Sequence, residues 1–224
     1  GRSVTGRTKT LPTGATPRAR IAFTSCANYA NGFYSAYRAI AQRADLDLWV
    51  HLGDYIYEYP QGTYGDEALA QSRALVPAGE VVTLADYRAR YGHYRRDPDL
   101  QEVHRQHPLV AVWDDHEITN DAWAGGAENH QSATEGGWSD RVLAATQAYL
   151  EWLPLRVGDT PLPPVIYRSF AFGDLFDLLM LDTRLIGRDE QAGITTVEQN
   201  EKGDPAVLAD PARSILGEAQ EGWL

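Results

Sequence analysis

The sequence of 224 residues is poor in cysteine and has no long apolar run. Its one cysteine, Cys26, excludes an intrachain disulfide and leaves a thiol free to bind a metal. The longest apolar runs, such as residues 178–181, are too short for a transmembrane helix, which needs about 20 apolar residues. With 43% hydrophobic and 23% charged residues, the composition is that of a globular protein and excludes disordered, collagen-like and coiled-coil chains.

Positive charge is also scarce. Lys and Arg total 20 against 31 Asp and Glu, which gives a formal net charge of −11 at pH 7, and only Lys9 and Lys202 are lysines. Nucleic-acid binding requires a cationic face that displaces counterions from phosphates. Because the sequence contains no basic block, we expect no nucleic-acid recognition. The acidic balance instead suits the binding of metal cations.

The first half of the sequence predicts a parallel α/β sheet. Residues 20–26 and 47–53 are short apolar runs that predict buried strands. Between them, residues 33–43 carry apolar side chains at three- and four-residue spacing, which predicts a helix. Such a βαβ unit is typical of a parallel sheet. Residues 107–113 predict a third strand.

The remaining segments predict further helices and an antiparallel pair. Thr83, with Asp86 three residues later, forms a variant of the capping box and predicts a helix over residues 83–96. Residues 140–153 predict an amphipathic helix that stops before a proline. Residues 165–182 predict a β-hairpin, which we expect to join the edge of the parallel sheet.

Each of the three predicted parallel strands is followed by side chains that can bind a metal. The ligands of open α/β sheets bind beyond the carboxyl ends of the strands, so these side chains should meet at one edge. Thiolate and phenolate suit a trivalent iron, and carboxylates suit Ca²⁺ or Mg²⁺. The set comprises Cys26 after the first strand, Asp54 and Tyr57 after the second, and Asp114, Asp115 and His116 after the third.

Taken singly, these residues also have structural explanations. A lone cysteine is usually a small core residue, and an aspartate after a strand commonly caps a turn or a helix. Two adjacent carboxylates without a cation would repel each other, so the whole set favours a metal site. Asn120 could offer its amide to a phosphate or its carbonyl to a cation. His51 lies within a predicted strand and is interpreted as a core residue.

Four segments resemble the PhoD-type alkaline phosphatase/phosphodiesterase family. They are SCANYANGF at residues 25–33, HLGDYIYE at 51–58, WDDHEITN at 113–120 and LDTR at 181–184. The resemblance extends over nearly the whole chain. The family includes enzymes described as calcium-dependent phospholipases D, and it shares its Gly-Asp-x-x-Tyr segment with the purple acid phosphatases.

The resemblance implies an α/β fold of the calcineurin-like metallophosphoesterase type, an αββα sandwich of which this chain would be the N-terminal portion. Residues 1–17 would be a linker from an upstream β-sandwich domain, and residues 18–224 would be the first half of the catalytic domain. The family's further metal ligands lie downstream of the segments found here. We therefore expect a C-terminal half of the same domain, as a second chain or as a segment missing from this sequence.

The resemblance also implies site residues and cofactors, Fe³⁺ and Ca²⁺. Cys26, Asp54 and Tyr57 resemble iron ligands, with Asp54 bridging to calcium. Asp115 resembles a ligand of the second centre by its match to the Asn-His-Glu segment of related metallophosphatases; Asp114 is the alternative. The resemblance gives two further residues, His116 and Asn120, the position of phosphate-facing catalytic groups.

The function implied is that of a secreted, metal-dependent phosphoesterase. It would hydrolyse phosphate mono- or diesters by attack of a metal-bound hydroxide. Two alternatives remain at this stage. One is a phospholipase D that acts on choline phospholipids, for which tryptophans such as Trp123 and Trp138 could contact the lipid. The other is a non-catalytic, calcium-binding interaction module. The expected partner is accordingly a phosphate-ester or phospholipid substrate.

Overall fold

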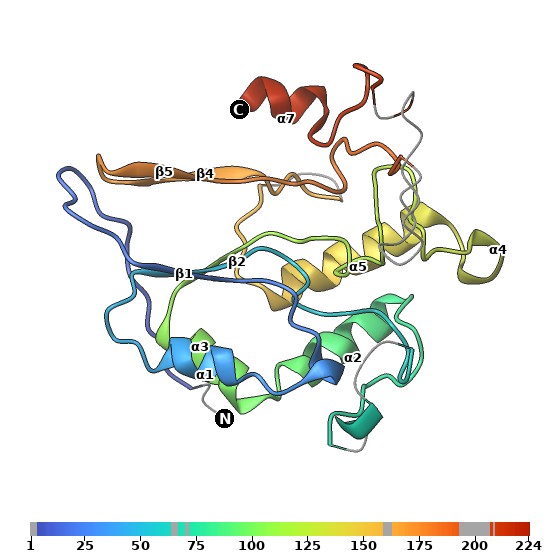
Figure 1. Cartoon of the computed structure of the whole chain (residues 1–224), viewed down its shortest axis with the longest axis horizontal. Helices are drawn as coiled ribbons and strands as arrows, with labels where there is room; N and C mark the ends of the chain where they lie inside the picture. The colour runs from blue at the N-terminus through green and yellow to red at the C-terminus, as the bar shows by residue number, and fades with distance from the viewer. Residues whose placement is uncertain (1–3, 64–66, 70–71, 159–162, 193–206, 208) are drawn as a thin grey trace.

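A computed structural model describes residues 4–63, 67–69, 72–158, 163–192, 207 and 209–224 of the chain. The fold is mixed α/β and contains a parallel sheet (Figure 1). Three strands, β1 (Ile21–Thr24), β2 (Leu48–His51) and β3 (Leu109–Ala111), lie in the order β1-β2-β3. The predicted three-stranded parallel arrangement is therefore confirmed, although each strand is shorter than the predicted segment.

Burial differs between the strands of this sheet. All four residues of the central strand β2 are buried, as predicted. The expectation of a buried strand is wrong for β1, where Phe23 is 73% exposed. β1 lies at the edge of the sheet, so it has a neighbouring strand on one side only.

Helices α1 (Ser35–Ala41) and α3 (Pro98–Gln106) lie together on one side of the sheet (Figure 1). The helix predicted over residues 33–43 corresponds to α1. Helix α3 was not predicted from the sequence; it begins at the N-cap Asp97 and the N1 residue Pro98 and buries only Leu100 and Val103. With so few apolar positions, its capping residues are stronger indicators of a helix than its periodicity.

Helices α2 (Leu84–Tyr94) and α5 (Trp138–Trp152) pack against each other. The capping box predicted for α2 is present, since the Thr83 and Asp86 side chains each accept from the other's backbone N–H. Aromatic side chains fill the core around these helices, including the fully buried Tyr87, Tyr91 and Tyr149. The shorter helices are η1 (Tyr29–Asn31), η2 (Glu67–Leu69) and α4 (Ser132–Glu135).

The predicted hairpin is present as β4 (Arg168–Phe172) and β5 (Phe176–Met180), which pair antiparallel. The expectation that it joins the parallel sheet is wrong, because β4 and β5 form a separate two-stranded sheet. The guanidinium Nη2 of Arg168 donates to the carbonyl of Ala111 on β3 at 2.6 Å, so this carbonyl is hydrogen-bonded to a side chain of the hairpin. The hairpin lies on the side of the parallel sheet opposite α1 and α3, and α7 (Gly217–Trp223) lies beyond it (Figure 1).

The segment before β1 contacts the rest of the chain at several points. The backbone N–H of Arg7 donates to Arg105 at 2.7 Å, and the N–H of Thr16 donates to Asp174, in the hairpin turn, at 2.9 Å. Among the described residues, the helices are too short and too polar to cross a membrane. The assignments of residues 1–17 as a linker and 18–224 as half of a catalytic domain stay predictions.

Candidate metal centre

The loops that follow β2 and β3 are packed tightly against each other. Gly53, two residues after the end of β2, has φ +106°, and a Cβ at this position would lie 2.3 Å from the backbone nitrogen of Asp114. Only glycine allows both this conformation and this approach. The close contact brings the residues after the two strands to one edge of the sheet, as the sequence predicts.

One buried carboxylate, that of Glu117, holds the two loops together. Its Oε2 accepts from the backbone N–H groups of Asp54 at 2.9 Å and Asp114 at 2.8 Å. Its Oε1 accepts from the N–H of Tyr55 at 2.6 Å. Glu117 is 1% exposed, so these hydrogen bonds are shielded from water. The backbone of Asp54 is thereby fixed relative to that of Asp114.

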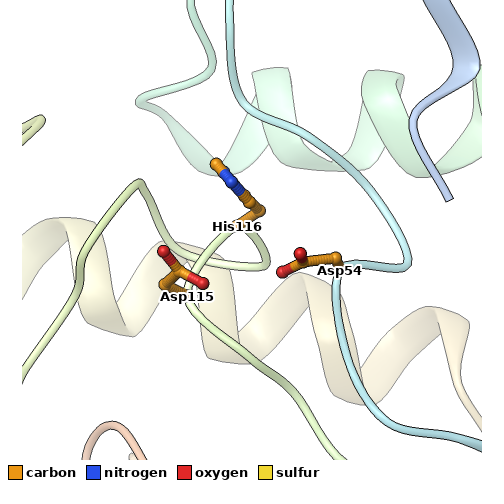
Figure 2. A group of neighbouring side chains, drawn as sticks. All are labelled: Asp54, Asp115 and His116. Atoms are coloured by element: carbon orange, nitrogen blue, oxygen red, sulfur yellow. The ribbon is translucent and has the colours of Figure 1, made fainter. Parts of the chain in front are cut away.

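Asp54, Asp115 and His116 form the centre of the candidate site. Each offers a ligand atom, and these three atoms lie within 4.8 Å of one another. The two carboxylates face each other from different loops (Figure 2). Within the described part of the chain, the buried Oδ1 of Asp54 finds no hydrogen-bond partner. A buried carboxylate oxygen without a donor is costly, and a cation would satisfy it.

Tyr57 lies against this centre. Its hydroxyl donates to Oδ2 of Asp54 at 3.1 Å, and its ring stacks on His116 with 4.2 Å between centroids. Burial, followed by the charges of Asp54 and Cys26, raises the pKa of Tyr57. The phenol is therefore neutral here, and a phenolate would require a nearby cation.

Cys26 approaches the same group from the loop after β1. Its backbone N–H donates to Gly53 at 3.2 Å, and its thiol interacts with Asp54 and Tyr57. Burial and the charge of Asp54 raise the pKa of Cys26, although a hydrogen bond with Ser25 opposes them. Cys26 is exposed and lies outside the close cluster formed by Asp54, Asp115 and His116.

Backbone strain is concentrated at this site. Among the described non-glycine residues, positive φ angles occur at Cys26 (57°), Asp54 (55°) and Asp121 (54°). The backbone N–H of Asp121 donates to Oδ2 of Asp115 at 2.7 Å, so this residue also belongs to the site. Left-handed conformations of non-glycine residues cost energy and persist where the surrounding structure enforces them, commonly at functional sites.

His116 is held by the buried carboxylate of Glu58. The Nδ1 of the ring lies 2.7 Å from Oε2 of Glu58, which is 0% exposed. Burial by itself would lower the pKa of His116. The hydrogen bond and charge of Glu58, together with Asp115 and Asp54, outweigh that effect and raise the pKa to about 9. Glu58 therefore fixes Nδ1 as a donor and leaves Nε2 for a ligand or a substrate.

The Asn120 side chain forms its hydrogen bond with a residue outside the close cluster. Its Nδ2 donates to Glu128 at 2.9 Å, and its backbone N–H donates to Glu58 at 2.7 Å. The phosphate-facing role predicted for Asn120 stays a prediction, as do the metal-ligand roles of Cys26, Asp54, Tyr57 and Asp115.

Besides the loops after β1, β2 and β3, the segment after β5 contributes Arg184 to the site. Its Nη2 lies 3.1 Å from Oδ1 of Asp115, and its Nε donates to Asp114. The carboxylate of Asp182 accepts from the Arg184 N–H at 2.9 Å and fixes this turn. Within the described residues, the buried Nη1 of Arg184 has no hydrogen-bond partner. Arg184 thus forms ion pairs with both aspartates, and of the two only Asp115 also belongs to the close cluster.

The electrostatics of the two clustered carboxylates favour a bound cation. Burial raises the pKa of Asp54, and the charge of Asp114 adds to this effect while His116 opposes it. Burial also raises the pKa of Asp115 to about 6, against the lowering effect of Arg184 and His116. A cation would stabilise both ionised carboxylates and displace their protons. Carboxylates, an imidazole, a phenol and a thiol together could hold a hard cation and a trivalent metal.

Three residues that shape this site, Glu58, Glu117 and Arg184, were not among the predicted site residues. All three lie within the segments that carry the family resemblance. A carboxylate beside predicted ligands is the signal that could have identified Glu58 and Glu117. Arg184 lies four residues after β5, and no comparable signal marks it. The interpretation of His51 as a core residue is confirmed, since it is fully buried and its Nε2 lies 2.9 Å from the Tyr37 hydroxyl.

Known proteins are similar to this chain in sequence and in structure. The family model of the PhoD-like phosphatases matches residues 21–224. Alkaline phosphatase D of Bacillus subtilis (strain 168) is 40% identical over 226 residues, which cover 99% of this chain and 37% of that protein. A solved structure of PhoD matches with a TM-score of 0.84 and 39% identity, over 97% of this chain and 41% of that one. The chain thus spans about two-fifths of the length of these relatives.

Proposed function

The chain belongs to the PhoD-like phosphatase family, and from this premise we propose that it is part of a metal-dependent phosphoesterase. The observation that carries the proposal is the cluster of Asp54, Asp115 and His116, with an unpartnered buried oxygen on Asp54. This cluster lies at the carboxyl end of a parallel sheet. The relative from Bacillus subtilis, which is 40% identical, is named alkaline phosphatase D. The reaction would be the hydrolysis of phosphate mono- or diesters.

The donor set fits two kinds of metal ion. Cys26, Asp54 and Tyr57 would hold the ferric ion, and Asp54 with Asp115 would hold calcium. An anionic thiolate and a phenolate suit a trivalent iron and support the first assignment, and the carboxylate oxygens support the second. When bound, such ions polarise phosphoryl oxygens and lower the pKa of water.

The protein's own side chains would bind and orient the phosphate. Glu58 holds the His116 ring so that Nε2 is directed away from the Glu58 contact, where it can donate to a phosphoryl oxygen. Arg184 adds a buried guanidinium whose Nη1 lacks a hydrogen-bond partner among the described residues. A planar guanidinium matches the geometry of a phosphate. We assign Asn120 to the outer part of the same phosphate site.

Two further proposals concern the whole protein. We propose that the metal site takes additional ligands from a C-terminal half of the domain, supplied by a second chain or a further segment. The support is that this chain matches 37% of the length of its relative. That half would complete the calcineurin-like αββα sandwich. We also propose, from the family resemblance, that the protein is secreted, which separate assays of cells and medium would test.

The metal content of the purified protein tests the proposed function. We expect about one iron per molecule, together with calcium, and hydrolysis of a chromogenic phosphate ester. Asp54→Asn should lose both the metals and the turnover, because Asp54 is placed at the centre of the donor set. Asp45→Asn is the matched control, since Asp45 forms exposed ion pairs with Arg20 and Arg43.

The other outcomes distinguish the competing functions. If Asp54→Asn retains metal and full turnover, the assignment is wrong. Calcium without iron, and no hydrolysis of any ester by the chain together with its C-terminal half, would instead support a non-catalytic calcium-binding module. Rates on a choline phospholipid that exceed those on small mono- and diesters would support a phospholipase D.

A further inference from the structure

A pocket opens directly beside the candidate metal centre. Its volume is about 370 Å³, and Cys26 and Tyr57 form part of its wall. A pocket of this size can hold a phenyl ring or a short aliphatic chain. Because two of the proposed iron ligands line it, a group in this pocket would be adjacent to a phosphate at the metals.

The chemistry of the pocket is uncharged and partly aromatic. None of the described residues that line it is Asp, Glu, Lys or Arg. The amides of Asn28 and Asn31 provide polar groups, and Phe33, Tyr34 and Tyr37 provide rings. The remaining residues of the lining are small or hydroxylated, namely Thr24, Ser25, Ala27, Gly32 and Ala36. Such a lining favours an uncharged organic group over a second phosphate.

The aromatic part of the lining is held rigidly. The Tyr34 hydroxyl donates to the carbonyl of Ala27 at 2.7 Å, and the Tyr37 hydroxyl lies 2.9 Å from Nε2 of His51. The two tyrosine rings meet edge to face, with 5.1 Å between centroids. Phe33 contrasts with them because it is 62% exposed. It is therefore the ring of the pocket with the most surface available to a ligand.

A buried arginine lies behind Phe33. The guanidinium carbon of Arg73 is 5.3 Å from the centre of the Phe33 ring, within the range of a cation–π contact. Arg73 is fixed by Asp97, at 2.7 Å, and by the carbonyl of Tyr29, at 2.9 Å. This contact orients the ring and places a positive charge beside it. The ion pair with Asp97 compensates that charge, so Arg73 gives the pocket no net positive charge.

We propose that this pocket is the subsite for an uncharged aromatic or aliphatic group esterified to the substrate's phosphate, with Phe33 as its main contact. The proposal rests on the proposed phosphoesterase function and extends it by naming the class of ester. It disfavours polyanionic substrates, because the lining offers no cationic side chain to a second anionic group. Phe33 would determine which ester group the protein prefers.

Equilibrium binding of non-reacting ligands to the full chain loaded with iron and calcium tests the subsite. Calorimetry would compare phenylphosphonate with methylphosphonate, which shares the anion but lacks the ring. The unaltered protein should bind phenylphosphonate more tightly. Phe33→Ala should weaken phenylphosphonate about 2- to 12-fold, the size of one aromatic contact, and leave methylphosphonate unchanged. Leu143→Ala, which truncates another partly exposed apolar side chain, is the control and should change neither affinity.

Three results would overturn the subsite. They are equal affinity for the two phosphonates, no effect of Phe33→Ala on phenylphosphonate, and tighter binding of a phosphonate with a second anionic group, such as 4-carboxyphenylphosphonate, than of phenylphosphonate. Turnover is measured separately. A protein that includes the C-terminal half and shows the Phe33-dependent preference but hydrolyses no ester would retain the subsite and contradict the phosphoesterase function, so the two failures are distinguishable.

Discussion

At the scale of single residues, the candidate site depends on carboxylates that the described structure places in hydrogen bonds around the cluster. Glu117 accepts three backbone N–H groups, and Glu58 orients His116. Glu58 also accepts from the Thr119 hydroxyl, the Asn120 N–H and the Asn129 amide. These bonds fix the positions of groups that would otherwise sample several rotamers.

Glu58→Gln provides a selective test of this orienting role. The three donors other than His116 reach Oε1, so a glutamine oxygen can keep those bonds. The amide nitrogen that replaces Oε2 cannot accept from Nδ1 of His116, so only this contact loses its acceptor and its charge. We expect turnover of the loaded protein to fall about 10- to 100-fold, as for other residues that support a metal ligand or catalytic group. The pKa of His116 should fall as well, which nuclear magnetic resonance of the ring can measure.

Glu102→Gln is the matched control for that variant. Glu102 forms an exposed pair with Arg105, and the substitution should leave both turnover and the His116 resonance unchanged. An unaltered pKa of His116 in Glu58→Gln would contradict the orienting role, because a purely structural glutamate would not act on the ring's charge.

The sequence predicts the residues of the cluster better than their surroundings. Asp54, Asp115 and His116 follow strands, so the edge of the sheet brings them together as predicted. The orientation of Asn120 depends on Glu128, a contact that no spacing rule indicates. Arg184 comes from a segment after β5, in a separate sheet. Its position depends on tertiary packing and could not be predicted from strand order.

At the scale of elements, the loops after β2 and β3 behave as one unit. Gly53 allows their approach, Glu117 bonds to both, and the cluster contains residues of each. The parallel order of the strands followed from the βαβ pattern, because short apolar runs separated by a helix have few alternative arrangements. The separate hairpin did not follow, since the choice of a neighbour for an edge strand depends on side chains such as Arg168.

Gly53→Ala should disrupt this unit. A Cβ there would lie 2.3 Å from the Asp114 nitrogen, and φ is +106°. The backbone conformation alone costs an alanine about 1–3 kcal/mol, and relief of the clash requires the loops to separate. We therefore expect a lower midpoint in urea unfolding and weaker binding of the metals, measured as iron and calcium per molecule.

Gly79→Ala is the corresponding control. A Cβ at Gly79 meets no heavy atom within 4 Å, and this glycine lies in the loop before α2. It should retain the stability and the metal content of the unaltered protein. Retention of both properties by Gly53→Ala would show that the loops can separate without affecting the site.

At the scale of the whole molecule, buried neutral histidines couple stability to pH. His104 accepts at Nε2 from Arg95 at 2.6 Å and lies 2.7 Å from the Tyr55 hydroxyl. Arginine can only donate, so Nε2 carries no proton. Burial, followed by the charges of Arg95 and His51, lowers the pKa of His104 from 6.5 to about 2. Burial likewise lowers the pKa of His51 to about 3.

These two histidines should destabilise the fold as the pH falls. Below pH 6.5 the unfolded chain binds protons at both residues, whereas the folded protein does not until the pH approaches 3. The free energy of unfolding should therefore decrease by about 1.4 kcal/mol per histidine for each pH unit within this window. Their contribution to stability is complete above pH 6.5.

His104→Gln separates this effect from the titration of the acidic residues. The glutamine oxygen can accept from Arg95 and Tyr55 but takes up no proton, so the slope of unfolding free energy against pH should be smaller by about 1.4 kcal/mol per unit between pH 6 and 5. Urea titrations at several pH values measure this slope. Val103→Ala, in the same helix, removes a buried side chain and should lower stability equally at every pH. If His104→Gln keeps the slope of the unaltered protein, the buried His104 carries a proton in the folded state.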